Sequence, residues 1–259
     1  MFRRIRDLDM HFQVAGPEEA PVLLMLHSLG TGLQVWDAPA AALAGRFRVL
    51  RPDLRGHGLT SVPPGPYRIE QMAADVLALL DDLRIGAAHV AGLSIGGLVA
   101  QTMAAQAPER VTSLVLCDTA LAIPPVELWH QRAALARREG MEPLVEPVCA
   151  RWVTPGFQGT PEAAGLRAML RRTAPEGYAG AAEAIAACDL SGVTPGIRCP
   201  ALVLVGEEDQ ATPVAAAEAL RDAIPGARLV VLPGLAHLPL AERPEAVLAP
   251  MRDFLEAAA

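Results

Sequence analysis

The sequence predicts an α/β fold: a mostly parallel central sheet with helices on both faces and a helical insertion after the middle strands. Three observations support this prediction. Short apolar segments alternate with longer amphipathic ones, the short segments are apolar at nearly every position, and the stretch from about 120 to 195 contains no such segment. Strands buried on both faces have this continuous apolar pattern, and the covering helices supply the amphipathic segments.

Six apolar segments have the length of buried strands. They are 22–26, 48–52, 88–92, 111–117, 201–206 and 228–234. Residues 69–83, 213–224 and 243–258 show the apolar spacing of helices. Residues 120–195 contain helix-like segments separated by glycine and proline, which predicts a helical cap over the carboxyl edge of the sheet. We expect residues 1–259 to form a single domain that includes this cap.

Composition and charge exclude several classes of function. The chain has 259 residues, of which 52% are hydrophobic, and a formal net charge of -7. This charge gives no long-range attraction to nucleic acid or to an acidic membrane surface. All 22 basic residues are arginine, which excludes a lysine Schiff base and the lysine of a phosphate-binding loop. We expect a small-molecule substrate, and the sequence does not predict the oligomeric state.

The four cysteines are scattered and form no CxxC pair and no cluster with histidine at metal-ligand spacing. They are typical of reduced thiols. The amino-terminal segment contains no apolar run long enough for a signal peptide or a membrane span. We therefore expect a cytoplasmic protein that needs no metal ion and no cofactor.

The segment GLSIGG (92–97) follows a predicted strand and precedes a helix-prone run. Glycine at positions 92 and 96 removes side chains that would collide across a tight strand-to-helix turn. Such a turn forces its central residue into strained backbone angles and exposes its side chain. The pattern therefore predicts that Ser94 is a nucleophile.

A serine hydroxyl needs a base to remove its proton. His237 is the best candidate because GLAHLP (234–239) follows the last predicted strand, at the same sheet edge as Ser94. An acid should orient this imidazole, and GEEDQATP (206–213) offers Glu207, Glu208 and Asp209. We favour Asp209, which lies deepest in the loop, and Asp118 after the strand 111–117 is the rival.

Two backbone N–H groups should stabilise the oxyanion formed during acyl transfer. Ile95 supplies one because it opens the helix after Ser94. The loop HSLG (27–30) follows the first apolar strand and should supply the other, and we choose Leu29. His27 and His57 begin loops at this edge and are expected to order them by hydrogen bonding.

In this order, HSLG, DLRGHG, GLSIGG, GEEDQATP and GLAHLP resemble the α/β-hydrolase family over essentially the whole chain. RWVTPGF (151–157) and TAPEGYAGAAEAI (173–185), both in the predicted cap, are also similar to segments of the 3-oxoadipate enol-lactonases of aromatic catabolism. This resemblance implies a carboxylic-ester hydrolase that opens an enol-lactone through an acyl-serine. Its substrate carries a carboxylate, so a local cation is expected.

Trp129 and Arg132 are the candidates to pack on the lactone ring and to pair with the carboxylate. Three other functions stay open at this point. A broader short-chain esterase or a perhydrolase-like enzyme would use the same triad. A non-catalytic binding protein could share the fold, because fold alone does not determine function.

Overall fold

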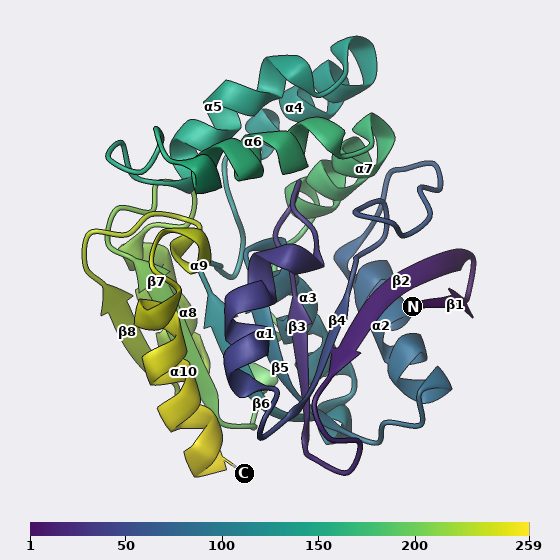
Figure 1. The fold of residues 1–259 in the computed structure, drawn as a ribbon, viewed down its shortest axis with the longest axis vertical. Helices are drawn as coiled ribbons and strands as arrows, with labels where there is room; N and C mark the ends of the chain where they lie inside the picture. The colour runs from purple at the N-terminus through teal and green to yellow at the C-terminus, as the bar shows by residue number, and fades with distance from the viewer. Residues whose placement is uncertain (259) are drawn as a thin grey trace.

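The structure is a computed structural model that describes residues 1–258, and its centre is one eight-stranded sheet (Figure 1). The strands are β1 (Phe2–Ile5), β2 (Leu8–Ala15), β3 (Val22–Leu26), β4 (Arg48–Pro52), β5 (Ala88–Leu93), β6 (Val111–Cys117), β7 (Ala201–Gly206) and β8 (Arg228–Leu232). Their order across the sheet is β1-β2-β4-β3-β5-β6-β7-β8. Every neighbouring pair from β4 to β8 is parallel. The predicted mostly parallel α/β sheet is confirmed.

The antiparallel strands β1 and β2 were not among the predicted segments. They pair with each other, and β2 continues antiparallel onto β4. In β2 the buried apolar residues Leu8, Met10 and Phe12 fall on alternate positions, with the exposed Asp9 between the first two. A strand with one solvent-exposed face alternates in this way, so a search for continuous apolar segments does not find it.

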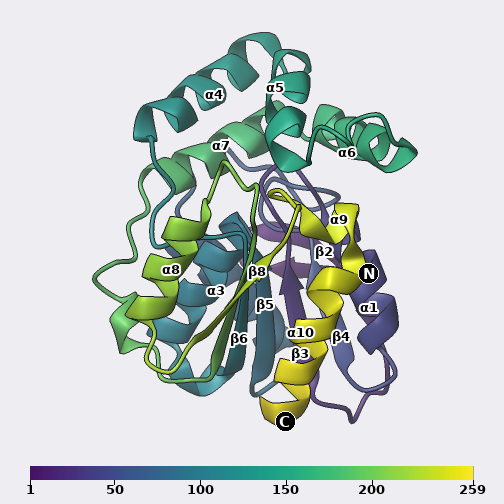
Figure 2. The same ribbon diagram turned by 90° about the vertical axis from the view of Figure 1, so that its left-hand side faces the viewer.

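Helices cover both faces of the sheet (Figures 1 and 2). They are α1 (Asp37–Leu43), α2 (Ile69–Asp82), α3 (Ile95–Gln106), α4 (Val126–Glu139), α5 (Glu142–Trp152), α6 (Pro161–Arg172), α7 (Pro175–Ala186), α8 (Val214–Ala223), α9 (Pro239–Glu242) and α10 (Pro244–Ala258), with short 3-10 helices at Leu33–Trp36, Pro108–Arg110 and Thr194–Gly196. One face carries α1 and α10, and the other carries α2, α3 and α8. Over the described residues, no helix is both long enough and apolar enough to cross a membrane.

The helices α4 to α7 lie between β6 and β7 in the chain and gather above one end of the sheet (Figure 1). Ion pairs from Arg137 of α4 to Glu176 and Glu183 of α7 join two of them. The last residue of α5, Trp152, accepts a 2.7 Å hydrogen bond from the N–H of Leu238, just after β8. Helix α5 is therefore tied to a loop of the sheet edge that these helices cover, and α4 is tied to α7.

Candidate active site

The carboxyl ends of the parallel strands bring distant loops together beneath α4–α7. Strand register places Leu26 of β3 beside Gly92 of β5, and Cys117 of β6 beside both Leu93 and Leu204. The loop after β3, the turn after β5 and the loops after β6 and β7 therefore start side by side. In open α/β sheets, ligands bind at this edge.

The turn from β5 into α3 is sterically crowded. A Cβ atom on Gly92 would lie 2.3 Å from the carbonyl oxygen of Gly96, and one on Gly96 would lie 2.4 Å from that of Leu26. Ser94, between them, has φ 55° and ψ -116°, a left-handed conformation that is costly for a residue other than glycine. The glycines thus have the steric function that the sequence predicted, and they hold Ser94 at the start of α3.

Substitution of Gly96 by alanine is expected to lower the free energy of unfolding by more than about 2 kcal/mol, because the new methyl group meets rigid backbone. The matched control is Gly165→Ala in α6, where an added Cβ meets nothing within 4 Å. This control should instead raise stability by up to about 1 kcal/mol, the helix propensity difference. Urea unfolding of both variants measures the two effects, and equal stabilities would contradict the steric account of the turn.

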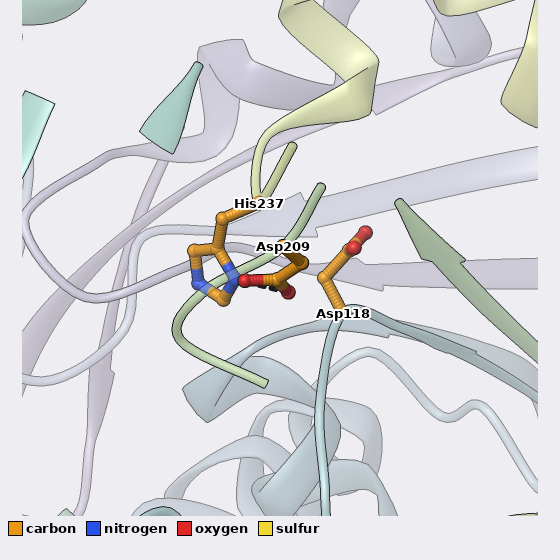
Figure 3. Close-up of side chains that lie close together, drawn as sticks. All are labelled: Asp118, Asp209 and His237. Atoms are coloured by element: carbon orange, nitrogen blue, oxygen red, sulfur yellow. Dashed lines mark hydrogen bonds and ion pairs between the residues drawn. The ribbon is translucent and has the colours of Figure 1, made fainter. Parts of the chain in front are cut away.

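Asp209 lies against His237 (Figure 3). Its Oδ2 atom is 2.8 Å from Nδ1 of the imidazole, and both residues are buried, with 4% exposure each. A carboxylate only accepts, so Nδ1 carries the hydrogen and Nε2 keeps a free lone pair. An imidazole in this tautomer is a base, which is the property that a serine nucleophile requires.

Three donors besides His237 stabilise the Asp209 carboxylate. Its Oδ1 accepts from the N–H groups of Ala211 (2.7 Å) and Thr212 (3.1 Å), and its Oδ2 accepts from the Thr212 hydroxyl (2.6 Å). Burial alone would raise the pKa of Asp209, but His237 and Thr212 outweigh it and the pKa lies below its usual value. Asp209 is therefore an anion at neutral pH, whereas Glu207 and Glu208 are exposed.

Ser94 and His237 meet in one pocket under α4–α7. Within residues 1–258 no hydrogen bond directly joins the two side chains. They share a small cavity with the proposed oxyanion loop and with aromatic and basic side chains. The cavity is lined by Ser28, Leu29, Ser94, Trp129, Arg132, Val148, Arg151, Trp152, Tyr178, Ala211 and His237.

Two backbone N–H groups are available at or next to this cavity, those of Leu29, which lines it, and of Ile95, which follows the lining residue Ser94. Ile95 is the first residue of α3, and a helix leaves its first N–H groups without internal acceptors. Leu29 lies in a turn that lines the cavity, and within the described chain its N–H has no acceptor. Both groups are thus free to bind an oxyanion.

Buried histidines hold the loop that contains Leu29. His57 donates from Nδ1 to the Arg55 carbonyl (3.0 Å) and accepts the N–H of Gly30 at Nε2 (3.1 Å). His27 accepts the N–H of Leu54 at Nε2 and donates to Ser28. Both must be neutral to accept these bonds. Burial, together with the nearby His27, lowers the pKa of His57 to about 3.

The free energy of unfolding should therefore fall as the solution is acidified. An unfolded histidine has a pKa of about 6.5. Below this pH the histidine binds a proton in the unfolded chain, whereas His57 in the folded protein stays unprotonated. The contribution of His57 is complete above about pH 6.5 and falls by about 2 kcal/mol between pH 7.5 and pH 5. Urea unfolding at both pH values should show this loss in the wild type and a smaller one in His57→Gln, whose side chain keeps an acceptor but does not titrate. The same pH dependence in both proteins would refute the role of His57.

Asp118, the rival acid, lies on the far side of Asp209 from His237 (Figure 3). One side-chain ligand atom from each of Asp118, Asp209 and His237 lies within 4.8 Å of the others, and within residues 1–258 this is the one group of acidic and imidazole side chains close enough to hold a metal ion. However, Nδ1 of His237 and both oxygens of Asp209 already have hydrogen-bond partners. A metal would have to displace these bonds, so the donor set fits a hydrogen-bonded acid–base pair better.

The two cap residues predicted to bind substrate both line the cavity. The guanidinium of Arg132 lies over the Trp129 ring, 5.1 Å from its centroid. Arg151 was not among the predicted site residues; it lines the same cavity from α5 and donates to the Gln210 carbonyl (2.7 Å). The sequence did contain an indication of this role, because Arg151 is the first residue of the RWVTPGF segment that resembles the enol-lactonases. Across residues 1–258, neither Arg132 nor Arg151 has a carboxylate partner within ion-pair distance.

Residues 23–249 match the family described as "Alpha/beta hydrolase family". The chain belongs to this family, which accounts for the sheet, the turn at Ser94 and the loops that meet above it. The resemblance inferred from the sequence is thus confirmed.

Individual relatives indicate which kind of hydrolase the chain is similar to. The chain is 37% identical to 3-oxoadipate enol-lactonase 2 of Acinetobacter baylyi, over 93% of this chain and 91% of that protein. Its fold matches the crystal structure of the enol-lactonase from Burkholderia xenovorans with a TM-score of 0.96 and 40% identity, covering 99% of this chain and 100% of that one. A thermophilic esterase from Thermogutta terrifontis, solved with malate bound, matches with a TM-score of 0.91 and 34% identity over 97% and 94% of the two chains. These similarities support ester or lactone hydrolysis by this protein.

Proposed function

We propose that this protein hydrolyses 3-oxoadipate enol-lactone, with Ser94 as nucleophile, His237 as general base and Asp209 as the acid that orients it. One observation carries the catalytic assignment. His237 bonds to buried Asp209 through Nδ1, and the same imidazole lines the cavity that contains Ser94. The relatives named as enol-lactonases support the choice of substrate.

The reaction follows from these positions. His237 Nε2 takes the proton of the Ser94 hydroxyl as its oxygen attacks the lactone carbonyl, and the N–H groups of Leu29 and Ile95 stabilise the oxyanion. The ring C–O bond then breaks, and the His237 imidazolium gives its proton to the enolate oxygen that leaves the carbonyl carbon. The resulting enol stays attached to the acyl chain on Ser94 and tautomerises to a ketone. His237 next activates a water molecule, which hydrolyses the acyl-serine and releases Ser94.

The charges of the cavity support an anionic substrate. The protein carries a net charge of -7, yet Arg132 and Arg151 face the nucleophile without carboxylate partners in the described chain. Burial, and then the charge of Arg132, lowers the pKa of Arg151. A substrate carboxylate would relieve this repulsion and bind through charged hydrogen bonds. The buried Tyr178 lines the same cavity, and its hydroxyl, which lies near Arg132, is a further donor there.

A broader carboxylesterase is the second candidate, because the esterase from Thermogutta terrifontis is also a relative. That esterase was solved with malate, a dicarboxylate, so an esterase of this group can also bind an acidic compound. The two candidates differ in the substrate that they turn over best. Two statements about this protein stay predictions: that it is cytoplasmic, and that it has no partner other than its substrate.

The substrate assignment is tested by kcat/KM on 3-oxoadipate enol-lactone and on p-nitrophenyl acetate, a neutral ester. The wild type should prefer the lactone. Arg132→Gln should lower kcat/KM for the lactone about 10- to 100-fold, mainly through KM, because a charged hydrogen bond is lost. It should change kcat/KM for the neutral ester less than about threefold. The control is Arg138→Gln, an exposed arginine of the same helix.

Each arm of this comparison has a result that would count against the proposal. A wild type that prefers p-nitrophenyl acetate would favour the broader esterase. Equal losses on both substrates in Arg132→Gln would show that Arg132 does not bind the carboxylate.

A further inference from the structure

Asp118 is a buried acid that the proposed mechanism does not use. It follows β6 directly, it has φ 44°, and its side chain is fully buried. Its Oδ1 accepts the N–H of Gly206 at 2.8 Å, whereas Oδ2 has no hydrogen-bond partner within residues 1–258. An unpartnered buried carboxylate oxygen is costly, so the protonation state of Asp118 needs an explanation.

The neighbourhood of Asp118 is acidic. Asp209 and Glu242 both act on it as like charges, and the nearest charge partner of Asp209 is His237. Two adjacent buried carboxyl groups cannot both ionise easily, and one of them keeps a proton. Asp209 receives four hydrogen bonds and Asp118 receives one. The negative charge therefore belongs on Asp209 and the proton on Asp118.

The direction of the Asp118 pKa agrees with this geometry. Burial, and then the charge of Asp209, raises the pKa of Asp118 well above its usual value. A proton on Oδ2 would also leave Oδ1 free to accept the N–H of Gly206. The pair thus resembles other carboxyl pairs that share one proton.

We propose that Asp118 is a reserve acid: it holds the proton of the Asp118–Asp209 pair in the intact enzyme, and it becomes the carboxylate that supports His237 when Asp209 is removed. This inference rests on the proposed function, because it assumes that His237 is the base. Asp118 acts through His237 and is therefore a positioning residue. Ligand atoms of all three residues lie within 4.8 Å of one another, so a negative charge on Asp118 would act on the imidazole through space, without the hydrogen bond that Asp209 makes.

The charge of Asp118 depends on whether the Asp209 carboxylate is present. With Asp209 present and ionised, Asp118 stays neutral throughout the reaction. Without the Asp209 carboxylate, its repulsion of a negative charge on Asp118 disappears. Water can also enter the space that the carboxylate leaves and reduce the burial that is the larger cause of the raised pKa, so that Asp118 can release its proton to solvent. The new carboxylate then offsets the charge of the imidazolium that forms when His237 takes the Ser94 proton.

The test is a double-mutant cycle on kcat/KM with Asp118→Asn, Asp209→Ala and the double variant. The amide introduced by Asp118→Asn keeps an acceptor for Gly206 and mimics the neutral acid, so this substitution alone should cost less than about threefold. Asp209→Ala should cost about 100- to 1000-fold, less than the roughly 10000-fold typical when a triad acid is lost. Asp118→Asn should cost at least a further tenfold or so in the Asp209→Ala background. If Asp209→Ala does not fold, Asp209→Ser replaces it in the cycle.

A structural role for Asp118 would lower activity by the same factor in both backgrounds, and that result would overturn the inference. A loss of activity in Asp118→Asn alone, comparable to that of Asp209→Ala, would also overturn it. Ser94→Ala distinguishes a failure of the proposed function from a failure of the role given to Asp118. If Ser94→Ala stays active, the proposed function fails, whereas an inactive Ser94→Ala with equal factors for Asp118→Asn defeats only the reserve acid.

Infrared spectroscopy supplies a readout that does not depend on turnover. The wild type at neutral pH should show the C=O stretching band of a protonated buried carboxylic acid. This band should be absent from Asp118→Asn and from Asp209→Ala, since Asp118 is replaced in the first and ionised in the second. A wild-type spectrum without the band would contradict the assignment of the proton to Asp118.

Discussion

The closeness of β3, β5 and the start of α3 is the constraint on which the rest of the site depends. A single extra carbon at Gly92 or Gly96 would overlap backbone oxygen atoms, so the chain can turn here only with glycine at both positions. The same closeness strains Ser94 and sets the start of α3 against the end of β3, where a Cβ on Gly96 would meet the carbonyl oxygens of Leu26 and His27. One steric condition thus fixes the proposed nucleophile and one oxyanion donor together.

Long-range hydrogen bonds extend this order to residues far apart in the sequence. His57 binds the N–H of Gly30 and so holds the loop with Leu29, while Asp209 holds His237 across 28 positions of the chain. Each of these imidazoles is oriented by a carbonyl or carboxylate that accepts from Nδ1. The first then uses Nε2 to support the backbone, and the second leaves Nε2 available for chemistry.

Much of this could be predicted from the sequence because the signals are local. Continuous apolar segments predicted the buried parallel strands, and the spacing of Gly92 and Gly96 predicted the turn at Ser94. The hairpin of β1 and β2 was missed because neither strand is continuously apolar: β1 is exposed at three of its four positions, and β2 has exposed residues among its buried ones. Arg151 begins a segment that the sequence singled out, but its position in the cavity depends on how α5 packs beside the loop after β7, which the sequence does not show. Strand register across β6 and β7 sets the distance from Asp118 to Asp209, so the sequence offered these residues as rivals and could not show that they are neighbours.

The most direct test of the account is covalent labelling with a fluorophosphonate, which reacts only with an activated serine. Digestion and mass spectrometry of the wild type should show one adduct, on the peptide that contains Ser94. His237→Asn should label at least about 100-fold more slowly, because the serine has lost its base. Inactivation through an adduct on another residue, or equally fast labelling of His237→Asn, would contradict the claim that His237 activates Ser94.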